Sequence, residues 1–158
     1  MDSVMKEVLS GFRSLKKALI DASSIIIIKK AGFFGELSEA VSLCSLKEII
    51  EETRFQNLDI HLLPDVPGQA SNDEKFISCA LREKIPVISE DRKILMTMKN
   101  ENIPHYNAVM MLHFLLFKKR LDRKAHLACQ SRLMSAARYG DDVLEFAENV
   151  FRAVTKID

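Results

Sequence analysis

The sequence is poor in the residues that build cysteine or glycine sites. Its three cysteines, Cys44, Cys79 and Cys129, are an odd number without CxxC spacing, which argues against a zinc site or a disulfide framework. Free thiols are typical of a reducing compartment, so we expect a cytoplasmic protein. Gly32 and Gly35 are too sparse to form a phosphate-cradling nucleotide loop. The sequence therefore argues against a small disulfide-stabilised protein and against a nucleotide-binding protein with a glycine-rich loop.

Long apolar runs and a strong net charge are also absent. The apolar run 110–117 is stopped by the basic residues 118–120, before it reaches the length of a membrane span. The opening segment 1–7 mixes charged and apolar residues and does not resemble a signal peptide. The formal net charge of +1 gives no global field for a polyanion, although a carboxylate cluster would offset basic patches elsewhere. We expect one domain, residues 1–158, without a membrane partner.

The chain does contain short apolar runs that alternate with helix-forming stretches. The four isoleucines at 25–28 favour a strand by propensity, but their place just after Asp21 favours a buried helix, and we predict a helix ending near Gly32. The predicted strands are 18–21, 43–45, 58–63, 86–89 and, at an edge, 103–106. The other helices predicted here are 33–41, 46–55, one opening at Ser71, 91–100 and 108–121. This alternation predicts an α/β fold whose parallel sheet is covered on both faces.

Helical patterns without strands flank this region. The opening helix is predicted from a stripe formed by Val4, Val8, Phe12 and Leu15. Two further helices are predicted at 123–139 and 142–154. Gly140 is the expected C-cap of the first and Asp141 the expected N-cap of the second.

The last predicted helix carries a continuous apolar stripe. Its members are Val143, Phe146, Ala147, Val150, Phe151 and Val154. Such a stripe is too apolar to remain in water, so it must cover either the domain's own core or a second copy of the chain. We expect a homodimer, because the domain has other helices for its core and twofold dimers are the commonest oligomers.

Four acids stand where an α/β fold would bring them together. Asp21 ends one predicted strand, and Asp91 lies just beyond another. Glu52 and Asp73 lie on neighbouring predicted helices. Ligands of open parallel sheets bind beyond the carboxyl ends of the strands. Four carboxylates there would make an oxygen-rich pocket suited to Mg²⁺ or Mn²⁺.

Each acid also has a structural interpretation. Asp91 can cap the helix that follows it, and Asp73 can favour the first turn of its helix through the helix dipole. Glu51 and Glu52 can form a solvated helix face. Asp21 is hardest to explain in this way, because an acid that ends a buried strand needs a partner. Considered together, the four acids favour a functional site.

Other residue types offer no competing catalytic site. The histidines, His61, His105, His113 and His126, are scattered along the sequence, and His113 is expected in the core or at an interface. Arg92 and Lys93 follow the acids and could hold backbone phosphates, as could the basic residues within 118–124. The alternative for the latter is a solvated helix end.

Four short segments keep a consistent order and spacing relative to the predicted strands. They are LIDASS at 19–24, IIEE at 49–52, SND at 71–73 and PVISEDR at 86–92. Together they resemble the PIN-domain family of nucleases over residues 18–121. The resemblance implies a three-layer α/β/α sandwich with a central, mostly parallel sheet. It also implies an enzyme that hydrolyses RNA phosphodiester bonds with Mg²⁺ or Mn²⁺. Residues 122–158 form a C-terminal helical extension outside the match.

The resemblance also implies roles for individual residues. The metal-binding and catalytic acids are Asp21, Glu52, Asp73 and Asp91, with Glu51 and Glu90 as alternatives one residue away. The supporting hydroxyls are those of Ser23 and Ser89, and the substrate-binding residues are Arg92 and Lys93.

The expected function is therefore a metal-dependent endoribonuclease. A divalent ion would supply the deprotonated water and relieve charge on the phosphate, and crowded acids would make the fold more stable with metal than without it. A toxin of a toxin–antitoxin pair, with an antitoxin protein as partner, is one role open to such an enzyme. The alternative is a non-catalytic PIN-like module that binds RNA or protein. The complete set of four acids favours the enzyme.

Overall fold

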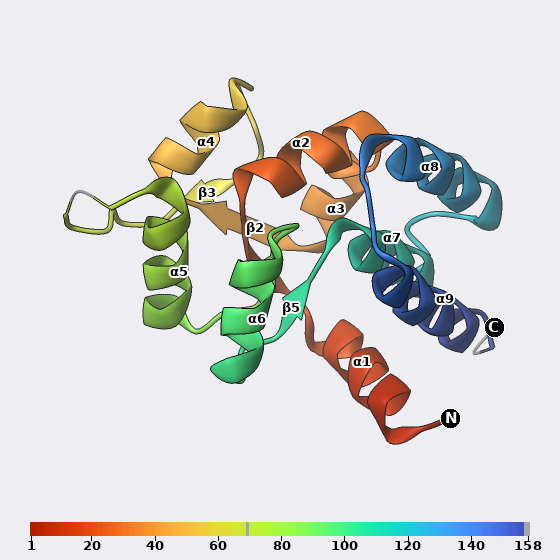
Figure 1. The fold of residues 1–158 in the computed structure, drawn as a ribbon. Coiled ribbons are helices and arrows are strands. Elements are labelled where there is room, and N and C mark those ends of the chain that lie inside the picture. The colour runs from red at the N-terminus through yellow and green to blue at the C-terminus, as the bar shows by residue number, and fades with distance from the viewer. Residues whose placement is uncertain (69, 157–158) are drawn as a thin grey trace.

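Five short strands form the centre of the computed structural model, which describes residues 1–68 and 70–156 (Figure 1). The strands are β1 (Lys17–Ile20), β2 (Ser42–Ser45), β3 (His61–Leu62), β4 (Val87–Ile88) and β5 (His105–Tyr106). All neighbouring pairs are parallel, and the order across the sheet is β3-β2-β1-β4-β5. The chain first builds the sheet outward from β1 to β3 and then crosses over to β4 and β5. The strand order therefore reverses between β1 and β4, which is the topological switch point.

Helices connect the strands and cover the sheet. They are α1 (Ser3–Ser14), α2 (Ala22–Ala31), α3 (Phe34–Ala40), α4 (Lys47–Thr53), α5 (Asn72–Glu83), α6 (Arg92–Asn100), α7 (Ala108–Phe117), α8 (Arg123–Ala136) and α9 (Asp141–Thr155). The four isoleucines lie in α2, where Ile25 and Ile28 are fully buried and Gly32 ends the helix in the left-handed conformation. The predicted α/β class and parallel sheet are confirmed, and each strand overlaps its predicted run.

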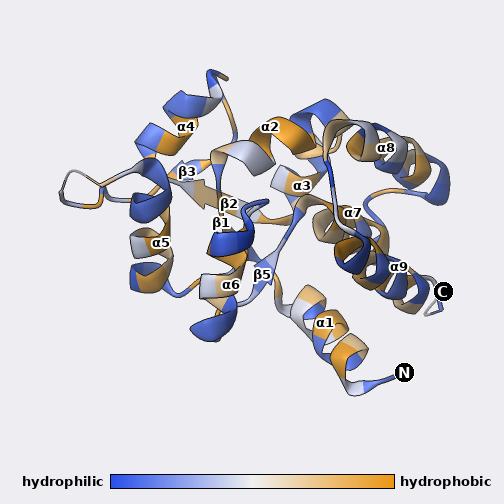
Figure 2. Cartoon of the chain, in the orientation of Figure 1, coloured by the Kyte–Doolittle hydropathy of each residue, from blue (hydrophilic) through white to orange (hydrophobic). Residues whose placement is uncertain are grey.

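The alternation of side chains along the strands divides the core into two clusters. Leu19, Cys44 and Val87 face one side, where α5 and α6 pack through residues such as Phe76 and Ile94. On the other side, Ala18, Ile20, Leu43 and Ile88 join the larger cluster formed with α1, α2, α3, α7, α8 and α9. Figure 2 shows the outer helices as mixtures of hydrophobic and hydrophilic residues. Among the described residues, no helix is long and apolar enough to cross a membrane.

The apolar stripe of α9 covers the domain's own core. This helix packs against α7 and α1, with Ala147, Val150 and Val154 buried. Phe146 lies at the edge of the contact and remains 39% exposed. The stripe therefore gives no reason for a second copy, and the homodimer keeps only the status of a prediction.

Two local predictions for the flanking helices are wrong. In α1 the buried residues are Met5, Leu9 and Phe12, whereas Val4 is 51% exposed. The inward stripe is displaced by one residue at its start, because spacings of three and four both fit a helical period. At the other end of the chain, Ala137 and not Gly140 is the C-cap of α8, and Gly140 is the N-cap of α9.

The cap prediction failed because the chain leaves α8 in an extended conformation. Ala137 has φ −118° and ψ 152°, so no left-handed turn closes the helix. Asp141 instead occupies the first turn of α9, where its charge complements the helix dipole.

Candidate functional site

Asp21 lies at the carboxyl end of β1 and caps α2. Its Oδ1 accepts hydrogen bonds from the Ser24 backbone N–H (2.9 Å) and from the Ser23 hydroxyl (3.4 Å). The side chain is only 6% exposed. A capping aspartate satisfies N–H groups that a helix start leaves open, but such a cap is usually solvated. The burial of this acid is therefore its distinguishing feature.

Ser89 joins the ends of β1 and β4 across the switch point. Its hydroxyl donates a hydrogen bond to Oδ2 of Asp21 and accepts one from the backbone N–H of Asp91 (3.0 Å). Ser89 is fully buried. The fold thus brings Asp21 and Asp91 to the same edge of the sheet, as the sequence analysis expects.

Asp91 is the N-cap of α6. One of its oxygens, Oδ1, accepts the backbone N–H groups of Lys93 (2.8 Å) and Ile94 (3.1 Å). The residue is half-buried, and Arg92 and Lys93 are exposed in the following turn. The capping interpretation therefore holds for Asp91, and its second oxygen accepts no hydrogen bond from the part of the chain that the structure describes.

Glu90 turns away from Asp91 towards the C-terminal part of the chain. Its Oε1 accepts the backbone N–H of Ala108 (2.9 Å) and the hydroxyl of Tyr139 (3.0 Å). Burial raises the pKa of Glu90 to about 7, and the charge of Asp21 adds to the increase. Glu90 therefore connects the switch point to α7 and to the segment between α8 and α9.

The pKa of Asp21 is raised from its usual 3.8, and burial is the main cause. Hydrogen bonds from Ser24, Ser89 and Ser23 act in the opposite direction. The increase in the pKa of Asp21 therefore comes from the loss of contact with water and does not require a cluster of neighbouring carboxylates.

The other predicted acids lie exposed near the α4–α5 contact. The Glu52 Oε1 accepts a hydrogen bond from the Asn72 amide (3.3 Å), and Asp73 occupies the first turn of α5. Glu51 is 4.0 Å from Lys47 on the same helix. Among the described residues, no three His, Cys, Asp or Glu side chains converge closely enough to hold a metal ion. The shared shell of four acids therefore stays a prediction.

One acid at the carboxyl edge was missed by the sequence analysis. Glu48 lies in the first turn of α4, directly after β2, and its Oε1 is 3.9 Å from the Lys75 ammonium. Its Oε2 is buried and has no hydrogen-bond partner among the described residues. The rule that selected Asp21, an acid just beyond a strand, would also have selected Glu48. An orphaned carboxylate oxygen is costly, so Glu48 is suited to an additional polar partner.

The histidines are not all scattered in space. Nδ1 of His113 and Nε2 of His126 are 3.0 Å apart, and both rings pack against Phe151. Burial lowers the pKa of His113 to about 3 and that of His126 to about 4. The neutral pair lies between α7, α8 and α9, where one ring nitrogen of each histidine faces the other. The pair takes no part in the candidate site.

Comparisons with known proteins add no relative to this geometry. No family model, no curated protein and no solved structure matches the chain. The functional argument therefore depends on the site itself.

Proposed function

We propose that the chain is a metal-dependent endoribonuclease with its reaction centre at the switch point between β1 and β4. The observation that carries this proposal is the buried Asp21, linked through Ser89 to Asp91 at the edge where open α/β sheets bind ligands. A buried acid with a perturbed pKa in such a place is typical of a functional site. The resemblance to the PIN-domain family and the PIN-like sandwich remain part of the proposal.

The carboxylates at the carboxyl edge of the sheet would suit an Mg²⁺ or Mn²⁺ ion that has few direct protein ligands. Mg²⁺ keeps several waters and takes one or two direct carboxylates, which Asp21 and Asp91 could supply. Glu48, whose Oε2 has no hydrogen-bond partner among the described residues, would act through water, as would Glu52 and Asp73. A bound ion would lower the pKa of a water and stabilise charge on the phosphate.

The protein's own residues provide orientation and binding. Ser89 and the Ser24 N–H fix both oxygens of Asp21. The two N–H groups at the start of α6 fix Asp91. Arg92 and Lys93, exposed beside Asp91, are placed to bind backbone phosphates.

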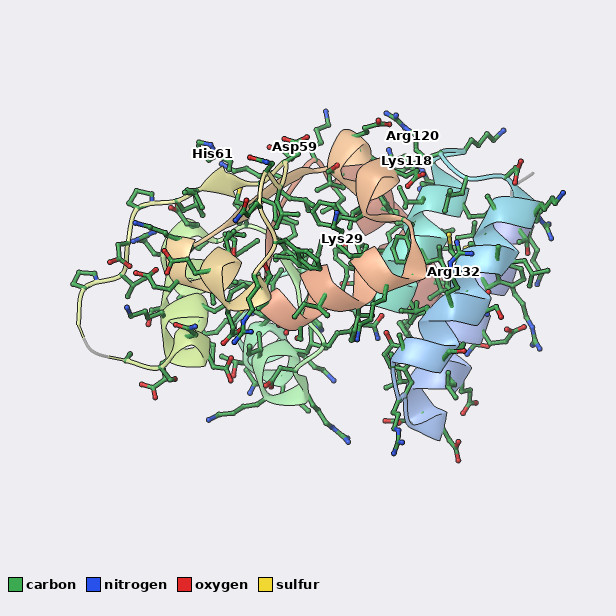
Figure 3. The ribbon with its side chains drawn as sticks, turned by 90° about the horizontal axis from the view of Figure 1, so that it is seen from above. Lys29, Asp59, His61, Lys118, Arg120 and Arg132 are labelled. Carbon is green, nitrogen blue, oxygen red and sulfur yellow. The ribbon has the colours of Figure 1, made fainter. Side chains whose placement is uncertain are left out.

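The test is cleavage of single-stranded RNA by the purified chain with Mn²⁺ or Mg²⁺ and with a chelator. We expect cleavage by the wild type with metal, and its loss in Asp21→Asn and Asp91→Asn. The matched control is Asp59→Asn, because Asp59 is an exposed acid in the segment before β3 (Figure 3). Equal activity of Asp21→Asn and wild type would overturn the assigned role.

A second measurement does not depend on activity. Mn²⁺ should raise the thermal midpoint of the wild type, because ions that bind only the folded state stabilise it. The increase should disappear in Asp21→Asn and persist in Asp59→Asn. An identical response of all three proteins would mean that the metal binds elsewhere.

The second candidate is a module that binds RNA without cutting it. The absence of a three-group metal cluster among the described residues favours it. RNA binding without cleavage, at any divalent concentration, would select this candidate. A role as a toxin, with an antitoxin partner, is a further prediction that a neighbouring small gene would support.

A further inference from the structure

Five exposed basic residues gather where α1 and α7 end. This basic patch consists of Arg13, Lys16, Lys118, Lys119 and Arg120. Arg13 and Lys16 belong to the end of α1 and the connection to β1, and the other three follow α7. Lys118 and Arg120 lie close together in Figure 3.

Aromatic packing holds the two segments of the basic patch together. The ring of Phe12 lies 5.5 Å from that of Phe114 and 5.7 Å from that of Phe117. The Arg13 guanidinium is 5.7 Å from the centre of the Phe117 ring, and the Lys118 ammonium is 5.9 Å from that of Phe114. Two charges of the basic patch, one from each segment, therefore lie against the same aromatic cluster.

Among residues 1–68 and 70–156, no ion pair neutralises the charges of the basic patch. Among the described residues, the salt bridges involve other side chains. Asp122, the acid nearest in sequence, accepts the backbone N–H of Ala125 at 2.7 Å as the N-cap of α8. Helix dipoles account for a cation in the last turn of α1 or just beyond α7, but not for five on one surface.

Lys17 does not belong to the basic patch, although it follows Lys16. Ala18 and Ile20 face the α1 and α7 side of the sheet, so Lys17 and Leu19 face the other side. The nearby charge of Lys17 acts on the thiol of Cys44, which is on that other side. Lys17 is therefore a natural control for Lys16.

The basic patch lies one helix length from the candidate site. The first residue of α7, Ala108, donates its N–H to Glu90 at the switch point, and this ten-residue helix ends beside the basic patch. A helix of that length spans about 15 Å. Because α7 is buried, an RNA strand would pass over the surface, so at roughly 3.4 Å per nucleotide at least about five nucleotides would be needed to bridge the two places.

We propose that the basic patch is a second phosphate-binding site, which holds a single-stranded RNA whose cleaved bond lies at the switch point. This inference rests on the proposed nuclease function for its catalytic consequence. The expected binding of RNA depends only on the basic patch and not on the proposed nuclease activity. Contacts between cations and phosphates release counterions, so the affinity should fall steeply with salt.

Binding is tested with the wild-type chain in chelator, so that no cleavage occurs, using fluorescence anisotropy and a labelled 12-nucleotide RNA. The slope of log affinity against log salt should decrease by about 0.7 for each phosphate contact removed. We expect a decrease of about 1.4 for Lys118→Gln with Arg120→Gln and about 0.7 for Lys16→Gln. Lys17→Gln should leave the slope unchanged. Lys119 is left intact, because its φ of 59° makes substitution a backbone perturbation.

Cleavage is tested on RNAs of about four and about 12 nucleotides, chosen around the estimated span. The wild type should cut the longer RNA more efficiently, and Lys118→Gln with Arg120→Gln should abolish that advantage without affecting the shorter RNA. An unchanged salt slope in this double variant, with its thermal midpoint preserved, would overturn the inference. So would binding to anionic lipid vesicles with no binding to RNA. If no RNA is cut but the slopes change as expected, the nuclease proposal fails and the binding site stands.

Discussion

At the scale of single residues, Asp21 connects the candidate site to the stability of the fold. Burial raises its pKa above 3.8, so the folded chain holds a proton at this carboxyl more readily than the unfolded chain. The stability from this group is fully present below pH 3.8 and is lost as the pH rises through the folded pKa. At neutral pH the charged form of Asp21 therefore lowers the stability of the folded chain.

We predict that Asp21→Asn, in chelator at pH 7.5, unfolds at a temperature at least as high as the wild type. Asparagine keeps an acceptor for the Ser24 N–H and removes the buried charge. The difference should shrink as the pH is lowered from 7.5 towards 4, because the raised pKa makes protonation of the wild-type carboxyl progressively easier. Melts at the two pH values decide this. A variant that is less stable at pH 7.5 would show that the fold needs the charged form.

Gly11 is the second residue with a specific constraint. A Cβ at this position would lie 2.7 Å from the hydroxyl oxygen of Tyr106. Alanine at a helix interior is normally favoured over glycine by about 1 kcal/mol. We predict that Gly11→Ala gains this stability only in a Tyr106→Phe background and gains less, or loses, with tyrosine present. Urea unfolding of the wild type, the two single variants and the double variant measures the coupling between Gly11 and Tyr106. Additive changes in the free energy of unfolding would exclude the contact.

At the scale of elements, α9 is the helix whose contribution is easiest to isolate. Val150 is fully buried against the core, whereas Leu144 on the same helix is 38% exposed. We predict that Val150→Ala costs about 1–3 kcal/mol, while Leu144→Ala costs less than about 0.5 kcal/mol. Truncation after Tyr139 should give an aggregation-prone protein. Urea unfolding and light scattering measure both effects, and equal costs for the two substitutions would contradict the packing of α9.

The elements themselves could largely be predicted from sequence, because their signals are local. The strands β1, β2 and β4 lie in short apolar runs, and Ser71 and Asp91 each cap a helix where expected. The capping role of Asp21 was not predicted. The stripe of α1 was misplaced at Val4, because its inward face depends on which neighbour it meets. The end of α8 was misplaced because the following segment reaches out to Glu90, a contact that no local pattern encodes.

The candidate site was predictable only in part. Asp21 and Asp91 could be paired in advance, since parallel strands end at one edge. The orientation of Glu90, the orphaned oxygen of Glu48 and the pairing of His113 depend on contacts between distant segments. Whether Glu52 and Asp73 join the site depends on the placement of α4 and α5 relative to β1, which residue spacing does not determine.

At the scale of the whole molecule, stability should fall on the acid side because of the histidine pair. The pKa values of His113 and His126 lie near 3 and 4 in the folded chain, below the ordinary 6.5. Their contribution is fully present above pH 6.5 and is lost as the pH falls towards those values. Asp21 and Glu90 act with the opposite sign, since burial raises their pKa values.

We predict that replacing both histidines by leucine flattens the loss of stability between pH 6.5 and 4. The measurement is the free energy of unfolding in urea across this range, compared with the wild type. The double change leaves no unpaired ring nitrogen, unlike a single substitution. If the stability of the variant and that of the wild type fell equally between pH 6.5 and 4, the histidines would not be the cause of the loss at acid pH.

The contact between α1 and α9 has a consequence for the synthesis of the chain. Met5 and Leu9 are buried in a core to which α9 contributes, and Val150 follows Phe12 by roughly 140 residues. At about 5–20 residues per second, the ribosome needs roughly 7–28 s to make that stretch. During this interval the apolar side of α1 lacks its partner helix. The apolar side of α1 is therefore open to contact with other apolar surfaces until the distant helix α9 emerges.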